Sequence, residues 1–223
     1  MSKGQVFSQE ELKALETPLA DQIATAIDRG EYDKAKALAQ QMEKEASVII
    51  YTMEEFVTAL LSYVYQTEGD AGTEKALRYS AGKVMKPIFD GLGSKTFRET
   101  VEGFASFFRA HSCRGLRIEE DDEKVTLVLD PCGSGGRMVQ EGHFEAPKNL
   151  LRIKKAQAIT FFREDFPSYC SHCAVFHHMM PIEWSGRPFP PIELGKGPGD
   201  PCKWHVYKDQ TKIPERYYEQ VGK

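Results

Sequence analysis

The chain lacks the features that would direct it to a membrane or to nucleic acid. Its first five residues contain no apolar signal segment, and the longest apolar stretch, near residues 56–65, is about half of a membrane span. Basic residues are not in excess, because 29 Lys and Arg stand against 33 Asp and Glu, for a net charge of −4. Nucleic-acid binding depends on such an excess. We therefore expect a cytoplasmic protein that binds neither membrane nor nucleic acid.

Cysteine is also scarce, with five residues, an odd number. A disulfide framework normally uses an even number in an oxidising compartment, so we expect free thiols in a reducing one. Four of the five nevertheless fall within residues 132–202, each beside unusual local sequence. Free thiols gathered in one part of a chain are typical of metal sites and of nucleophilic centres. They are therefore the first candidates for function.

The first hundred residues have the apolar periodicity of helices. Leu and Ile recur every three or four positions over residues 12–27, behind a capping box that begins at Ser8, and Gly30 ends this helix. A second helix carries Leu38 and Met42. Three features are predicted after it: a helix over residues 52–66 with a break at residues 69–72, a helix that stops near Pro87, and a helix from Phe97 to Phe108.

The pattern changes near His111. Alternating apolar residues predict strands at 115–119, 124–130, 191–194 and 202–208. Helices are predicted over residues 147–162 and 168–180, the second with Pro181 after its end. The predicted fold class is α+β, in which a helical region of residues 1–110 packs on a mostly antiparallel sheet with flanking helices in residues 111–223.

The spacing of the thiols predicts that they meet. Cys170, Cys173 and His177 are three or four positions apart, so a helix would place them on one face. Cys132 follows a predicted strand, and Cys202 begins the last one. Because strand ends and a helix can converge at one point, we predict a metal site at the four cysteines, with zinc ahead of iron as the metal.

Two alternatives to zinc remain open. Four cysteines are also the ligand set of an iron–sulfur cluster. Buried cysteine can equally serve as a small hydrophobic residue, and Cys113, between a helix and a strand, is assigned to that class. Among the histidines, His177 is the best placed by spacing, whereas His172 is expected to point away from Cys170 and Cys173 on a regular helix.

A glycine-rich segment follows Cys132 directly and consists of Gly133, Ser134, Gly135, Gly136 and Arg137. Glycines expose backbone amides, which can form a nest for an anion or an oxyanion. Arg137 adds a guanidinium fork for a substrate carboxylate. An alternative chemistry makes Cys132 a nucleophile, with these amides as the oxyanion hole and a histidine as the base.

Three segments carry a resemblance to a known family. They are the strand and cysteine of residues 125–132, the aromatic–cysteine helix at Tyr169, Cys170 and Cys173, and the Gly199-Asp200-Pro201-Cys202-Lys203-Trp204 segment. In this order they resemble the L-2-amino-thiazoline-4-carboxylic acid hydrolase family and the related vinyl-reductase-type small-molecule-binding domains, over about residues 125–208. The resemblance implies an α+β domain behind a helical region, with the cysteines lining a pocket, and hydrolysis of a small ring or a related ligand role.

These observations lead to two functional hypotheses. In the first, Cys132, Cys173 and Cys202 hold zinc, Cys170 or a histidine completes the shell, and metal-bound water hydrolyses a small carboxylated, cyclic substrate positioned by Arg137. In the second, the thiols hold an iron–sulfur cluster or a structural zinc, and the protein binds or senses a small molecule. A homo-oligomer is compatible with either hypothesis.

Overall fold

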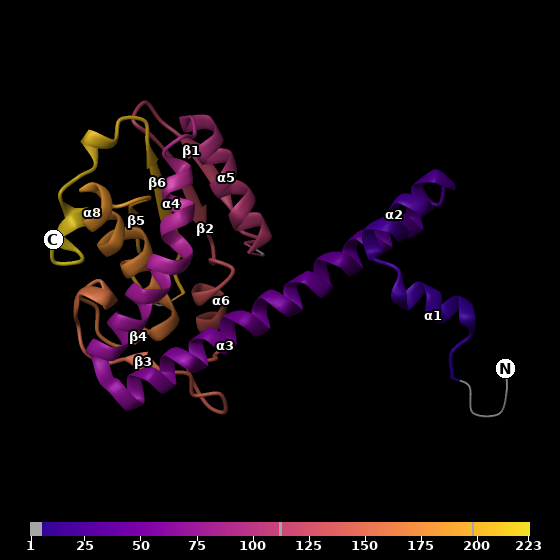
Figure 1. The fold of residues 1–223 in the computed structure, drawn as a ribbon, viewed down its shortest axis with the longest axis horizontal. Coiled ribbons are helices and arrows are strands. Elements are labelled where there is room, and N and C mark those ends of the chain that lie inside the picture. The colour runs from indigo at the N-terminus through magenta and orange to yellow at the C-terminus, as the bar shows by residue number, and fades with distance from the viewer. Residues whose placement is uncertain (1–5, 112, 198) are drawn as a thin grey trace. The chain divides into compact units, whose positions relative to one another are not determined.

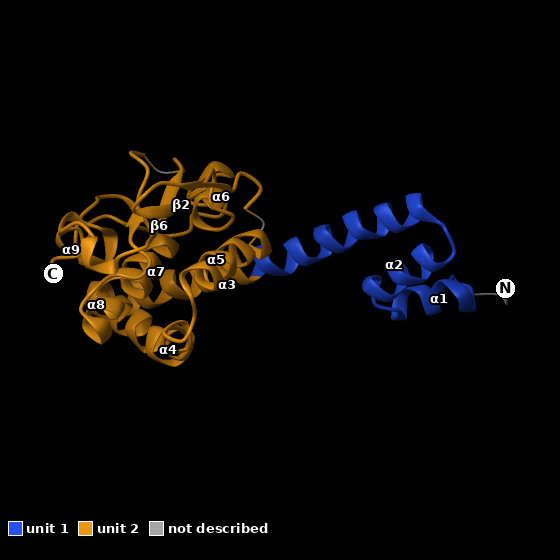
Figure 2. Cartoon of the chain, turned by 90° about the horizontal axis from the view of Figure 1, so that it is seen from above, with its two compact units in different colours: residues 1–52 blue, residues 53–223 orange. Residues whose placement is uncertain are grey.

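The computed structural model describes residues 6–111, 113–197 and 199–223. The first five residues, which the sequence argument used against a signal segment, lie outside the described residues. The chain divides into two compact units, residues 1–52 and residues 53–223 (Figure 2). Each unit is described by itself below, and the strands and all five cysteines belong to the second.

Unit 1 is helical. It contains α1 (Gln9–Glu16), α2 (Leu19–Asp28) and the start of α3 (Tyr32–Ser80). The capping box at Ser8 is confirmed, since Ser8 and Glu11 exchange backbone and side-chain hydrogen bonds of 3.2 and 2.7 Å. The single helix predicted over residues 12–27 is wrong, because Pro18 separates α1 from α2.

The helices that follow contain a break at Gly69 and a proline, Pro87. Gly69 interrupts α3 with non-helical angles, φ 66° and ψ −158°, which confirms the break predicted there. The helical path does not stop at Pro87, as predicted. A π-helix, η1 (Ala81–Met85), leads into α4 (Lys86–Leu92), and Pro87, which has no N–H to donate, lies in the first turn of α4 directly after this π-helix. Helix α5 (Phe97–Ala110) begins where the sequence predicts, and a capping box formed by Thr96 and Glu99 starts it.

The helical segment Tyr32–Leu92 is 61 residues long and contains a stretch with mean hydropathy 1.3, enough by length and composition to cross a membrane. One such helix is weak support for insertion, because helices of soluble proteins pass the same test. Two adjacent carboxylates, Glu54 and Glu55, lie in the apolar part of this helix, and in unit 2 they pair with Arg137 and Lys148. Charged residues of this kind are costly inside a bilayer.

Unit 2 is built around a four-stranded antiparallel sheet in the order β1–β2–β6–β5, which confirms the α+β class (Figure 1). Its strands are β1 (Arg117–Glu120), β2 (Lys124–Leu129), β5 (Ile192–Glu193) and β6 (Cys202–Tyr207). Helix α5 covers one face of the sheet, with Phe108 packed edge-on against Trp204 at 4.8 Å. All four predicted strands are therefore present; β1 begins two residues later and ends one residue later than predicted, and the other three lie within their predicted ranges.

The helix predicted over residues 147–162 is wrong. This segment instead forms the short strand β3 (Arg152–Ile153), which pairs with β4 (Phe166–Pro167), and a 3₁₀ turn, η2 (Ala158–Thr160). Asn149, Phe161 and Phe162 have positive φ angles of 49–54°, which a right-handed helix cannot contain. Ile153, Ile159 and Phe161 are buried from this irregular backbone, whereas Phe162 is exposed.

The segment that carries Cys170 and Cys173 is helical and longer than predicted. It comprises η3 (Ser168–Cys170), α7 (Ser171–Ala174), the π-helix η4 (Val175–Met179) and α8 (Met180–Ser185). Pro181 does not end it, because a π-helix again precedes the proline, as it does before Pro87. The two π-helices pack against each other in one apolar core. The remaining elements are α6 (Gly135–Gln140), η5 (Gln210–Lys212) and α9 (Arg216–Glu219).

Candidate functional site

Sheet pairing brings two of the predicted cysteines together. Cys202 opens β6 directly opposite Leu129, the last residue of β2. Cys132 lies three positions after the end of β2, so the two cysteines lie at the same end of these neighbouring strands. We refer to Cys132 and Cys202 as the strand-side cysteines.

The other two predicted cysteines come from the helical segment. Cys170 ends η3, and Cys173 lies within α7. Cys173 packs against both large apolar cores of unit 2, one under the sheet and one around the π-helices. We refer to Cys170 and Cys173 as the helix-side cysteines.

All four cysteines line one cavity of about 230 Å³. Burial raises the pKa of each thiol, to about 12 for Cys202. Proximity acts in the same direction, because every pair among the four is near enough for one thiolate to oppose ionisation of the other. The structure therefore places thiols that are up to 70 positions apart in the sequence along one cavity.

The glycine-rich segment wraps around a sulfur atom. The Gly136 N–H donates to Cys132 Sγ at 3.0 Å, and the amides of Ser134 and Arg137 also act on this thiol to offset the pKa increase caused by burial. A Cβ at Gly136 would lie 3.2 Å from Cys132 Sγ, and one at Gly135 only 2.4 Å from Cys170 Sγ. The amide nest predicted for a substrate anion thus surrounds the protein's own cysteine, and the glycines allow both sides of the site to approach.

Cys132 does not have the surroundings of a nucleophile. A reactive cysteine needs a lowered pKa, whereas burial raises that of Cys132, and the carboxylate of Glu54 adds to the increase. Burial also lowers the pKa of His177 to about 3, so this imidazole is neutral. The ring of His177 stacks edge-on against Trp204 at 4.4 Å, and its Nδ1 lies 3.4 Å from the Phe189 carbonyl.

His172 lies closer to the thiols than the regular-helix argument predicts. Its Nε2 is 3.5 Å from Cys173 Sγ, and its Nδ1 is 2.5 Å from the Tyr169 carbonyl. The expectation that it points away is wrong, because a 3₁₀ turn and a single α turn replace the regular helix. Since a carbonyl only accepts, Nδ1 carries the proton, and Nε2 presents its lone pair to the thiol. Burial lowers the pKa of His172 to about 4, which keeps the ring neutral.

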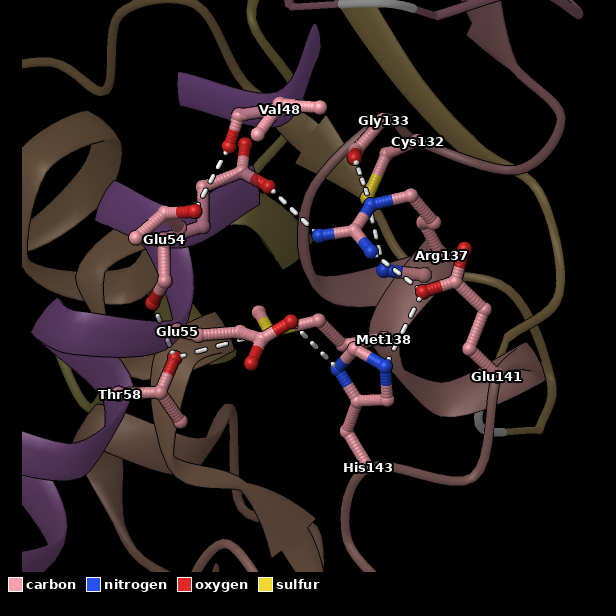
Figure 3. Close-up of polar contacts among 12 residues, drawn as sticks. Val48, Glu54, Glu55, Thr58, Cys132, Gly133, Arg137, Met138, Glu141 and His143 are labelled. Carbon is pink, nitrogen blue, oxygen red and sulfur yellow. Dashed lines mark hydrogen bonds and ion pairs between the residues drawn. The ribbon is translucent and has the colours of Figure 1, made fainter. Parts of the chain in front are cut away.

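Arg137 is engaged within the protein. Its Nη2 lies 3.0 Å from Glu54 Oε2, its Nε donates to the Gly133 carbonyl at 2.9 Å, and Nη1 pairs with Glu141 (Figure 3). The side chains of Arg137 and Glu54 are only 10% and 6% exposed. This buried pair fixes the backbone next to Cys132 and links it to α3. A substrate carboxylate at Arg137 would have to compete with these partners.

The same network extends to the surface through a histidine. His143 Nε2 lies 3.1 Å from Glu141 Oε2, and its Nδ1 lies 3.5 Å from Glu55 Oε1 (Figure 3). Glu55 also binds Lys148 at 2.8 Å. The loop after Cys132 is therefore held against α3 by a network of polar side chains as well as by apolar packing.

A second, outer cavity of about 490 Å³ also reaches the thiols, and Cys132, Cys170 and Cys202 line both. Its wall includes Arg163, which contacts the carbonyls of Leu194 and Gly195 and acts on the Cys202 thiol to lower its pKa, against the larger effect of burial. Arg163 was missed because it directly follows the helix predicted over residues 147–162, which does not form. Its distance from the cysteines in the sequence gives no signal of this contact.

Cys113 also belongs to the neighbourhood of the site. It lines the cavity of about 230 Å³ together with the other four cysteines, and its Sγ accepts the Gly133 N–H at 3.0 Å. Burial raises the pKa of this thiol to about 11. It thus supports the loop after Cys132 from behind, which is compatible with the packing role predicted for it.

The thiols do not close around a single point. Within residues 6–111, 113–197 and 199–223, no three Cys, His, Asp or Glu side chains are grouped as a binding site for one metal ion. Comparisons with protein-family models, with curated proteins and with solved structures found no match. The resemblance to the hydrolase family therefore stays a prediction from the motifs.

Proposed function

We propose that this protein binds an iron–sulfur cluster through Cys132, Cys170, Cys173 and Cys202. The observation that carries the proposal is four thiols lining one cavity of about 230 Å³. A tetrahedral zinc ion holds its sulfur ligands about 2.3 Å away, so a zinc site does not require a cavity of this size beside the thiols. Four cysteine thiolates around a wider space are the ligand set of a [4Fe–4S] cluster.

The chemistry of the donor set supports this assignment. Four buried thiolates would repel one another and lack solvation, so their ionised form needs a cationic group between them. The amides directed at Cys132 Sγ are the kind of hydrogen bond that tunes the reduction potential of a cluster. Such a cluster would supply one-electron transfer or act as a sensor of the redox state.

The outer cavity supports a small-molecule role at the same site. It brings solvent or a ligand to Cys132, Cys170 and Cys202, and its wall carries Arg163 and Lys196. The protein would thus be a binding or sensing module in which a ligand reaches the thiol centre from one side. The residues of the outer cavity would position the ligand, and the cluster would sense its presence or exchange an electron with it.

The zinc hydrolase predicted from the sequence is a second candidate. Three of the thiols that line the cavity of about 230 Å³ would leave one metal position for water or substrate, as catalytic zinc requires. In this case Cys132, Cys173 and Cys202 would hold the ion, and metal-bound water near pH 7 would be the nucleophile. Metal content separates the two candidates.

The test is a set of single substitutions in protein purified without oxygen. Cys132→Ser, Cys170→Ser, Cys173→Ser and Cys202→Ser should each lose most of the bound iron and sulfide and the visible absorbance. Cys113→Ser is the matched control, because it lines the same cavity and a hydroxyl can still accept the Gly133 N–H. It should keep the cluster.

Three results would overturn the iron–sulfur proposal. Stoichiometric zinc without sulfide would favour the hydrolase. Equal loss of iron in Cys113→Ser would mean that the cavity tolerates no change rather than that four ligands are specific. Absence of iron, sulfide and zinc from the wild-type protein would leave the thiols as packing residues.

A further inference from the structure

A third cavity, of about 250 Å³, is lined by residues of α4, α5 and the end of the helical segment that carries the helix-side cysteines. Its wall is formed mainly by Ile88, Phe89, Phe104, Phe107, Trp184 and Phe189. None of its lining side chains carries a charge at neutral pH. A charged ligand would lose its hydration there without compensation, so the cavity selects uncharged molecules.

Aromatic rings form much of this wall and meet one another at steep angles. Phe89 lies 5.4 Å from Trp184 and 6.0 Å from Phe189, measured between ring centroids, and Phe104 lies 5.9 Å from Phe189. The planes are tilted or perpendicular rather than parallel. Tilted rings around an open space favour a flat aromatic guest, which gains stacked and edge-to-face contacts with several of them.

One polar side chain, that of His177, narrows the class of ligand further. His177 lines both this cavity and the thiol cavity. Its Nδ1 faces the Phe189 carbonyl at 3.4 Å and therefore carries the proton of the neutral ring. Nε2 then bears a lone pair, and the described residues give it no hydrogen-bond partner. A ligand with a hydroxyl or N–H group can donate to it.

We propose that this cavity binds an uncharged aromatic molecule that carries a hydroxyl or N–H group, with the rings of Phe89, Phe104 and Trp184 around its plane and His177 accepting its proton donor. The volume suits one or two fused rings and is too small for a peptide segment. Because Phe176 and His177 separate the cavity from the thiols, the ligand lies next to the thiol centre. The site does not depend on which metal the thiols hold.

Calorimetric titration of the full-length protein with three matched probes tests the ligand class. We expect 2-naphthol to bind saturably, naphthalene to bind about three- to tenfold more weakly because it lacks the donor, and 2-naphthoate to show no saturable binding. His177→Phe should reduce the affinity for 2-naphthol to that for naphthalene. Equal binding of 2-naphthoate, or no saturable binding of 2-naphthol, would overturn the proposal.

The location is tested by filling the cavity. Gly103 on α5 lines it, and an added Cβ there meets nothing within 4 Å, so Gly103→Leu should fold and occupy the space. Its affinity for 2-naphthol should fall at least about tenfold. Gly91→Leu on α4 is the control, since Gly91 is equally open but does not line the cavity. Unchanged affinity in Gly103→Leu, or equal loss in Gly91→Leu, would place the binding elsewhere.

Discussion

The strand side and the helix side of the thiol cavity differ in whether backbone N–H groups stabilise a thiolate. Cys132 receives backbone N–H groups, and the Gly195 amide likewise lowers the pKa of Cys202 against the effect of burial. For Cys170 and Cys173 the described residues provide no such backbone donor, and burial and neighbouring thiols raise their pKa values well above the usual range. The strand side is thus partly prepared for thiolates, whereas the helix side depends on the group that the thiols bind.

This difference also explains why the charged network lies where it does. Arg137 and Glu54 support the loop after Cys132, whereas Cys170 and Cys173 pack against the apolar core around the π-helices, with the neutral ring of His172 beside Cys173. Fixed amides need a rigid backbone to remain aimed at a sulfur atom. A buried ion pair therefore stabilises the strand side, whereas apolar packing stabilises the helix side.

The largest expected effect comes from removing the support of the strand side. Arg137→Met leaves the carboxylate of Glu54 buried without its partner, and we expect it to destabilise the protein by about 3–5 kcal/mol in urea unfolding. The double variant Glu54→Gln/Arg137→Met should recover part of this loss, because no buried charge remains. If the double variant is as unstable as the sum of both single variants, the two side chains act independently and the network is not what holds the loop.

A smaller effect tests the helix side through pH. His178 donates through Nδ1 to the Tyr217 carbonyl at 3.0 Å and accepts the Ile192 N–H at Nε2 at 2.9 Å, an arrangement that only the neutral ring can make. Burial lowers its pKa to about 4 from 6.5. Its contribution to the free energy of unfolding is therefore complete above pH 6.5 and is lost as the pH falls towards 4, about 2 kcal/mol by pH 5.

The measurement is urea unfolding at pH 7 and pH 5 for the wild type and for His178→Gln. The glutamine can donate and accept but does not titrate, so the variant should be less stable at pH 7 and lose less stability between the two pH values. Identical pH slopes in the two proteins would contradict the assigned role of this histidine.

The smallest expected effect concerns the point where both sides meet. Gly135→Ala would place a Cβ 2.4 Å from Cys170 Sγ, whereas Gly136→Ala would place one 3.2 Å from Cys132 Sγ. We expect Gly135→Ala to cost about 1–2 kcal/mol and to lower the bound iron, and Gly136→Ala to have a smaller effect on both. A larger loss in Gly136→Ala would show that the strand side, and not the approach of the helix side, limits assembly of the site.

The sequence predicts the strand side of this site better than the helix side. The alternation around Val125 and the cysteine at the start of β6 place Cys132 and Cys202 correctly, because strand periodicity and pairing are local patterns. The helix side depends on a 3₁₀ turn and a π-helix, and a spacing rule for regular helices misplaces His172 there. Local spacing does not specify which helical hydrogen bonds form, since packing of the two π-helices decides it.

Long-range contacts are the other feature of the site that could not be predicted from the sequence. Glu54 and Arg137 are 83 positions apart, and neither has a neighbouring residue that indicates the pairing. The helix expected over residues 147–162 fails for a related reason, because apolar side chains there fill the core from backbone with positive φ angles. Burial explains the composition of such a segment, but not its conformation.

The most direct test is the iron, zinc and acid-labile sulfide content of the full-length wild-type protein purified without oxygen. The account predicts iron and sulfide in equal amounts, about four of each per chain, and little zinc. One zinc per chain with no sulfide, or no metal at all, would contradict it.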